Sequence, residues 1–174
     1  MIGLTILGVI VILLAVFLIS VYNSLVQLRQ RVQNAWAQVD VQLKRRYDLI
    51  PNLVGAVKGY AQHEKATLEG VTQARNMAMN AGNIQEQMQA ENMLSSALRS
   101  LFAVAEAYPE LKANANFMQL QAEITDTESK IAFARQFYND TVQKYNTKIE
   151  LFPTNLVAGM LGFAMVDYFN LQGE

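Results

Sequence analysis

The chain opens on an unbroken apolar run, residues 2–21, and none of the first 28 residues carries a charge. A helix needs about 20 apolar residues to cross the hydrocarbon core of a bilayer. A secretory signal peptide differs in having basic residues before a shorter apolar stretch and a small-residue cleavage site after it, and this run has neither. We therefore expect an uncleaved transmembrane anchor over residues 1–21.

Beyond the anchor, apolar residues recur at spacings of three and four, which places them on one face of a helix. The first stripe runs to Ile50 with no glycine or proline after Gly8. Pro51 disfavours helical geometry at the residue before it, so the chain either turns or kinks there, and we expect a turn, with Pro51 opening the next helix. Polar residues at 80–83 and Tyr108-Pro109 mark later breaks. The predicted helices cover residues 22–50, 51–79, 84–107 and 113–150.

Four amphipathic helices with short connections bury their apolar faces most simply in an antiparallel up-and-down bundle. No segment shows the alternation of a half-buried strand. The predicted fold class is all-α: an N-terminal transmembrane helix that continues into a four-helix bundle over residues 22–150, followed by a short apolar segment over residues 151–174.

That C-terminal segment is uncharged from Leu151 to Val166. The bundle topology returns it to the membrane surface, where apolar and aromatic side chains suit an interfacial position. The alternative is that it closes the end of the bundle or packs on a neighbouring subunit. The candidate contact residues are Phe152, Leu156, Met160, Leu161, Phe163, Tyr168 and Phe169.

Charge is divided unevenly along the chain. The net charge of −1 argues against a nucleic-acid surface, which needs clustered lysine and arginine. Residues 29–75 hold eight basic and four acidic side chains, whereas residues 86–174 hold six and eleven. Helices that attract one another across the bundle explain this division. Because the basic residues all follow the anchor, we expect the bundle on the cytoplasmic side, with an extracytoplasmic bundle as the alternative.

The densest charged group has two interpretations. It consists of Lys44, Arg45, Arg46 and Asp48. These residues either pair with acidic residues of another helix or recognise an acidic partner. We predict these four residues as a candidate partner-binding site. Asn139 and Asn146, seven residues apart beside the core stripe, similarly predict either a hydrogen-bonded polar layer or a partner face.

Three segments carry a family resemblance. They read AWAQVDVQLKRRYDLIPNLV over residues 35–54, YPELKA over 108–113 and FPTN over 152–155. With Tyr138-Asn139 and Tyr145-Asn146 at the expected spacing, the chain closely resembles the LemA family over essentially its whole length. The resemblance implies a bacterial or archaeal membrane protein with an N-terminal anchor and a four-helix bundle, and it supplies no catalytic residues.

The groups that enzymes need are missing from the sequence. The single histidine, His63, is followed by a glutamate as in a zinc-protease motif, but Thr67 stands where the second histidine ligand belongs. There is no cysteine, and no glycine-rich phosphate loop. We therefore expect no enzyme activity, no metal, no cofactor and no small-molecule substrate.

Two function classes follow. The first is a non-enzymatic scaffold or adaptor at the cell membrane that self-associates into a homo-oligomer. The second is an accessory or sensor subunit of another membrane complex, with residues 44–48 as the contact; the resemblance to the LemA family implies a membrane protease or a TPM-domain protein as that complex. The expected partners are the lipid bilayer, further copies of the chain and, in the second class, a membrane protein.

Overall fold

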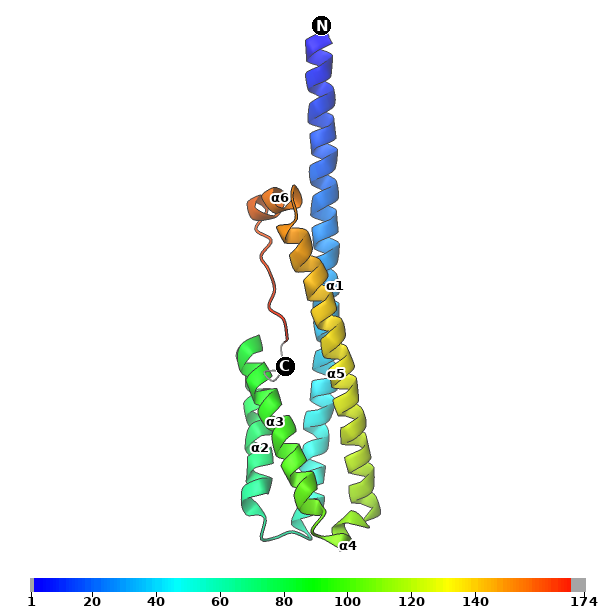
Figure 1. Cartoon of the computed structure of the whole chain (residues 1–174), viewed down its shortest axis with the longest axis vertical. Coiled ribbons are helices and arrows are strands. Elements are labelled where there is room, and N and C mark those ends of the chain that lie inside the picture. The colour runs from blue at the N-terminus through cyan, green and yellow to red at the C-terminus, as the bar shows by residue number, and fades with distance from the viewer. Residues whose placement is uncertain (1, 170–174) are drawn as a thin grey trace. The chain divides into compact units, whose positions relative to one another are not determined.

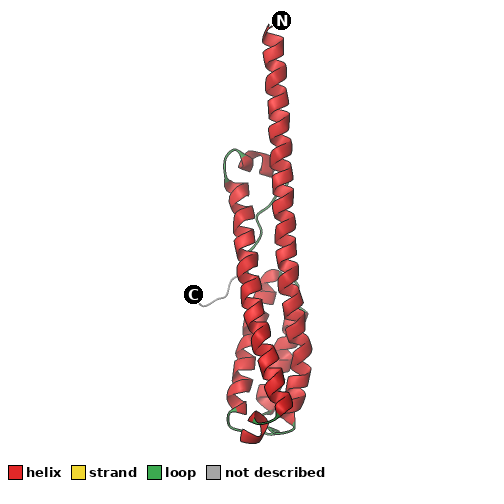
Figure 2. Cartoon of the chain, turned by 90° about the vertical axis from the view of Figure 1, so that its right-hand side faces the viewer, coloured by secondary structure: helices red, strands yellow, loops and turns green. Residues whose placement is uncertain are grey.

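The computed structural model describes residues 2–169, and within them every regular element is a helix (Figures 1 and 2). The all-α prediction is confirmed. Met1 and residues 170–174 of the predicted C-terminal segment lie outside the described residues. The helices are α1 (Ile2–Lys58), α2 (Lys65–Met79), α3 (Ile84–Ala105), α4 (Pro109–Lys112), α5 (Ala115–Glu150) and α6 (Thr154–Met160).

The described chain forms two compact units. The first contains residues 2–37 and 136–168, and the second contains residues 38–135 together with Phe169. Helices α1 and α5 each contribute to both units, because each crosses a unit boundary along its own length.

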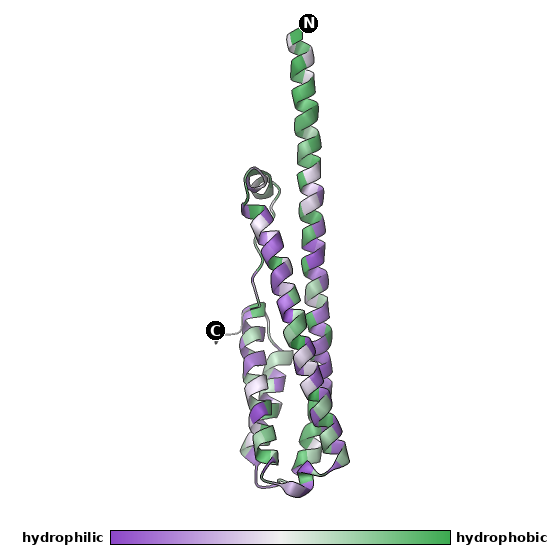
Figure 3. Cartoon of the chain, turned by 45° about the vertical axis from the view of Figure 1, so that its right-hand side comes forward, coloured by the Kyte–Doolittle hydropathy of each residue, from purple (hydrophilic) through white to green (hydrophobic). Residues whose placement is uncertain are grey.

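In the first unit, α1 begins with apolar side chains exposed all around the helix, visible as the continuous green stretch from the N-terminus in Figure 3. Further along, Val21, Leu25 and Val32 are buried. Here α1 lies against the end of α5, with the Trp36 and Tyr138 rings edge to face at 5.3 Å between centroids. Buried positions three, four and seven residues apart follow from the helical period that the sequence shows.

In the second unit, segments of α1, α2, α3 and α5 lie side by side (Figures 1 and 2). Their buried faces are the predicted apolar stripes. Local signals set the helix starts: the Asn83 side chain accepts from the Glu86 amide at 2.8 Å, and Asn114 accepts from the Phe117 amide at 3.0 Å. The largest buried apolar side chains of this unit include Leu43, Ile50, Leu53, Leu94, Leu101, Leu111 and Phe117.

The predicted turn at Pro51 is wrong. Helix α1 continues through Pro51 to Lys58, and the connection to α2 lies at residues 59–64. A proline inside a helix removes the amide that would bond to the carbonyl four residues earlier, here that of Tyr47. The Nε of Arg75 in α2 donates to this same carbonyl oxygen at 2.7 Å. A long-range side chain therefore satisfies the group that proline leaves unpaired, and local sequence signals do not show this.

The predicted start of the second helix at residue 51 is wrong for the same reason, and the limits of the later helices shift by two residues at most. Helix α2 ends at Met79 as expected but begins at Lys65, and α3 ends at Ala105, two residues before the expected end. The predicted fourth helix is preceded by the short α4, whose first residue is Pro109, a position that tolerates the missing amide.

The bond from Arg75 can be tested by its dependence on Pro51. Arg75→Met should lower the free energy of unfolding by about 1–2 kcal/mol, because the Tyr47 carbonyl loses its donor. In a Pro51→Ala background the amide of residue 51 can donate instead, so the same substitution should cost less. Urea unfolding of the full-length protein in detergent, followed by circular dichroism, measures both. Arg99→Met, at an exposed position of α3, is the control, and equal costs of Arg75→Met in the two backgrounds would refute this account.

Candidate functional site

The structure divides the predicted partner-binding residues between surface and core. Lys44 is exposed and pairs with Asp40 one turn earlier at 2.7 Å, and this pairing raises the pKa of Lys44. Arg45 lies 3.9 Å from Asp126 of α5, and Asp48 is exposed. Arg46 is only 1% exposed. Consecutive helix residues point about 100° apart, so four neighbours in sequence do not form one surface.

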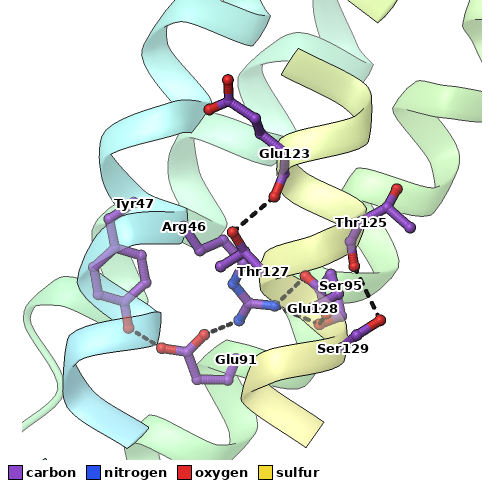
Figure 4. Close-up of polar contacts among 9 residues, drawn as sticks. All are labelled: Arg46, Tyr47, Glu91, Ser95, Glu123, Thr125, Thr127, Glu128 and Ser129. Carbon is purple, nitrogen blue, oxygen red and sulfur yellow. Dashed lines mark hydrogen bonds and ion pairs between the residues drawn. The ribbon is translucent and has the colours of Figure 1, made fainter. Parts of the chain in front are cut away.

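Arg46 is therefore not a surface contact residue, and its prediction as one is corrected. Its guanidinium is paired with the carboxylates of Glu91 in α3 and Glu128 in α5. It also donates to Ser95 Oγ at 2.9 Å, and the Tyr47 hydroxyl donates to Glu91 (Figure 4). We call these five residues the Arg46 cluster. For Arg45 and Arg46, pairing with acidic residues of another helix is the interpretation that the structure supports.

The electrostatics of the cluster are those of a desolvated ion-pair network. Burial raises the pKa of Glu91, and the charge of Arg46 opposes that rise. Nearby in the same unit, burial and repulsion from Arg46 lower the pKa of Arg135 to about 10, while Glu91 and Glu128 oppose this. The Arg135 guanidinium also stacks on the Phe169 ring at 4.4 Å. Two cations and two carboxylates thus balance each other inside the unit.

The cluster is suited to fixing helix register rather than to chemistry on a substrate. Arg46 and Glu91 are buried and bonded to each other, so neither is free to transfer a proton to an outside molecule. A buried pair adds little net stability over an apolar core, but removing one partner is costly. The cluster therefore ties α1 to α3 and α5 in one alignment.

The sequence analysis did not predict Glu91, Ser95 or Glu128 as members of this cluster. For Glu91 and for Arg46, however, the sequence holds a signal of burial. Glu91 stands three residues before Leu94 and seven before Leu98, which places it on the apolar stripe of α3. Arg46 stands between Leu43 and Ile50 in the same way on α1. A charged residue at a stripe position indicates a buried ion pair, because unpaired burial is expensive.

The seven predicted C-terminal contact residues also fall into two groups. Phe163 and Phe169 are only 8% and 1% exposed, so neither side chain lies on the outer surface of its own unit. Phe163 packs beside the Tyr22 ring at 6.0 Å, and the Arg29 guanidinium lies over its face at 5.1 Å. The remaining five residues are exposed: Phe152, Leu156, Met160, Leu161 and Tyr168.

Residues 161–168 form a turn at 161–162 and then an irregular segment, and together we call them the strap. Side chains of α5 hold the strap. The Asn146 amide donates to the Val166 carbonyl and its oxygen accepts from the Val166 amide, both at 2.9 Å. The Tyr138 hydroxyl donates to the Asp167 carbonyl at 3.0 Å. Asn146 thus takes the place that a neighbouring strand would occupy. Of the two interpretations of Asn146, a hydrogen-bonded polar layer or a partner face, the structure supports a hydrogen-bonded role. The partner of Asn146 is Val166 of the strap.

Asn146→Ala should loosen the strap without unfolding the helices. Two hydrogen bonds to part-buried backbone groups are lost, so local opening should become about 30-fold more frequent, given about 1 kcal/mol for each bond. Hydrogen–deuterium exchange of peptides covering residues 161–168 measures this opening. Gln143→Ala, at an exposed position of the same helix, should leave the exchange unchanged. Unchanged exchange in Asn146→Ala would mean that the side chain does not hold the strap.

Within residues 2–169, no three or more His, Asp or Glu side chains are grouped so that they could hold a metal ion. The N-terminal part of α1 is the one described helix that is long and apolar enough to cross a membrane. The described helices thus include one that could anchor the chain in a membrane and others that pack around buried side chains.

Comparison with known proteins places these features in a family. The model of the LemA family matches residues 35–174. Protein LemA of Metamycoplasma hominis is 29% identical over 84% of this chain and 68% of its own length. Magnetosome protein MamQ of Magnetospirillum gryphiswaldense and Magnetosome protein MamQ 2 of Paramagnetospirillum magneticum are each 24% identical, over 86% and 85% of this chain and 64% of their own length. The chain thus spans about two thirds of the length of these relatives.

Proposed function

Because the chain belongs to the LemA family, we propose that it is a membrane-anchored, non-enzymatic helical scaffold or adaptor that self-associates at the cytoplasmic face of the cell membrane. The observation that carries the proposal is the anchor of α1. Its apolar side chains are exposed on every side of the helix within the described structure. In water such a surface is unfavourable by about 25 cal/mol for each Å², and a bilayer removes that cost.

A second apolar surface supports contact with the same bilayer. Leu151, Phe152, Leu156, Met160 and Leu161 are exposed at the end of α5 and on α6, and we call them the apolar cap. In the first unit, α6 lies beside α1 (Figure 1), and the strap residue Phe163 packs against Tyr22, immediately after the apolar run. The cap is thus at the level where the anchor would leave the membrane, the depth at which aromatic and apolar side chains are favoured.

Self-association is supported by an uncovered face on the second unit. Val41 of α1 and Phe133 of α5 expose 60% and 73% of their surfaces. Both helices carry charged residues of both signs nearby, including Arg45 and Asp126, which pair across α1 and α5. A face with apolar residues among charges of both signs can match a second copy of itself, as symmetric oligomers require.

Light scattering of the full-length protein in a mild detergent, with mass spectrometry of everything that co-purifies, tests the proposal. We expect a single discrete multiple of 19.5 kDa with no other protein. The double variant Val41→Ser, Phe133→Ser should lower the measured mass towards that of the monomer. Met93→Ser, at an exposed apolar position of α3, is the control. A wild-type monomer would contradict self-association.

The alternative is an accessory or sensor subunit of another membrane complex. It is favoured by the exposure of Lys44, Arg45 and Asp48 on α1, which leaves part of the predicted partner-binding group at the surface. A monomer that co-purifies with a stoichiometric membrane protein, and loses it when Lys44 and Arg45 are replaced by glutamine, would support this second class.

A further inference from the structure

A cavity of the first unit lies between α1, α5 and the strap. Its volume is about 450 Å³, within the range of small-molecule sites. Four of its lining residues are aromatic, Trp36, Tyr138, Tyr145 and Phe163, and most of the others are apolar. No acidic residue lines it, and its one charged side chain is Arg29. A cavity with apolar walls and one cation favours an anion that carries an apolar part.

Arg29 is available for such a ligand. It is exposed, it makes no ion pair within residues 2–169, and its guanidinium carbon lies over the Phe163 ring, 5.1 Å from the ring centroid. Burial raises the pKa of the Tyr145 phenol and the charge of Arg29 opposes that rise, which places the guanidinium within electrostatic range of this wall. A guanidinium carries its N–H donors in its own plane, in a fork that matches phosphate oxygens.

The cavity also lies at the right depth. Arg29 follows Val21 by eight residues, which is about 12 Å along a helix. The polar headgroup layer extends about 5–8 Å beyond the hydrocarbon on each side. Helix side chains lean towards the N-terminus, so a long arginine side chain points back towards the anchor. The guanidinium thus reaches the level of the headgroup phosphates.

We propose that this cavity binds a phosphate group attached to an apolar body, with Arg29 holding the phosphate and the aromatic walls holding the apolar part. A membrane phospholipid is the source that its depth favours, and a soluble phosphate compound is the other source of the same chemistry. The inference rests on the membrane placement of the proposed function and adds a ligand class to it.

Trp36 is the single tryptophan of the chain and lines the cavity, so its fluorescence reports binding directly. Full-length protein in a neutral detergent is titrated with dihexanoyl phosphatidylglycerol and, separately, with inorganic phosphate. We expect a saturable emission change with the lipid, at least tenfold tighter than with inorganic phosphate. Equal affinity for the two would overturn the lipid source and assign the site to soluble phosphate compounds.

Two arginines of α1 provide a matched pair of variants. Arg29→Gln should weaken lipid binding at least tenfold, since it removes a charged hydrogen bond. Arg31→Gln removes the same charge two residues away, at an exposed position on another side of the helix, and should bind as the wild type does. Equal effects of the two variants, or no saturable change in the wild type, would overturn the proposal.

Alkaline carbonate extraction of cell membranes distinguishes a failure of the phosphate-site proposal from a failure of the membrane-anchor proposal on which it rests. A chain that resists extraction but shows no Arg29-dependent binding refutes the phosphate site and leaves the membrane anchor standing. A chain that carbonate releases refutes the anchor itself, and the depth argument falls with it.

Discussion

Arg46→Met is expected to lower the free energy of unfolding by about 3–5 kcal/mol, a large share of the 5–15 kcal/mol typical of a folded domain. The substitution keeps the length of the side chain but leaves the Glu91 carboxylate buried without its cation. Glu128 is partly exposed and can be hydrated, so Glu91 carries most of the cost. Urea unfolding of the full-length protein in detergent, monitored by circular dichroism, gives the value.

A second variant separates lost charge pairing from lost packing. In Arg46→Met, Glu91→Met the buried carboxylate is also gone, and apolar replacement of buried ion pairs is often neutral. At least half of the lost stability should return. Lys44→Met, two residues earlier at an exposed position, should change the stability by less than about 0.5 kcal/mol. A double variant no more stable than Arg46→Met would show that the buried charge is not the cause.

Replacement of Ile12 and Leu13 by lysine should detach the protein from the membrane. These residues lie near the middle of the apolar run, where a lysine costs about 2.5–3.5 kcal/mol of insertion free energy. The pair therefore costs about 5–7 kcal/mol, enough to reverse insertion. Carbonate extraction of membranes, followed by detection of the chain in the pellet and supernatant, measures the change.

The matched control keeps the hydropathy of the anchor. Ile12→Leu, Leu13→Ile exchanges the two residues and should remain in the pellet. The apolar cap can keep some of the lysine variant loosely bound to the membrane surface, and carbonate removes such peripheral binding. Carbonate-resistant membrane association of the lysine variant would mean that residues 2–21 are not the anchor.

The spacing of apolar residues along the sequence was sufficient to predict the all-helical class of fold. The stripes that run through Leu43, Ile50, Leu94 and Phe117 are the buried faces of the helices, because a helical period in sequence puts those positions on one side regardless of their partners. The exposed apolar run at the start of α1 could also be predicted from the sequence, because its length matches the hydrocarbon core of a bilayer.

Pro51 shows where local reasoning ends. A proline inside a sequence predicts the end of a helix, because it leaves one backbone carbonyl without its donor. Here Arg75, 24 residues later and on another helix, donates to that carbonyl. The same holds for residues 44–48. The sequence shows that these residues are charged. That Lys44 is exposed and Arg46 is buried depends on which side of α1 the other helices cover.

The sequence by itself therefore determined the helical class, an apolar run long enough to cross a membrane and the absence of familiar catalytic motifs, because hydrophobic periodicity and run length act locally. Only the tertiary structure decided that Glu91 and Glu128 meet Arg46, that Asn146 holds the strap, and that Phe163 closes one side of a cavity beside Arg29. Each of these joins residues at least 20 positions apart, and such contacts are fixed by how the helices pack rather than by the period of any one of them.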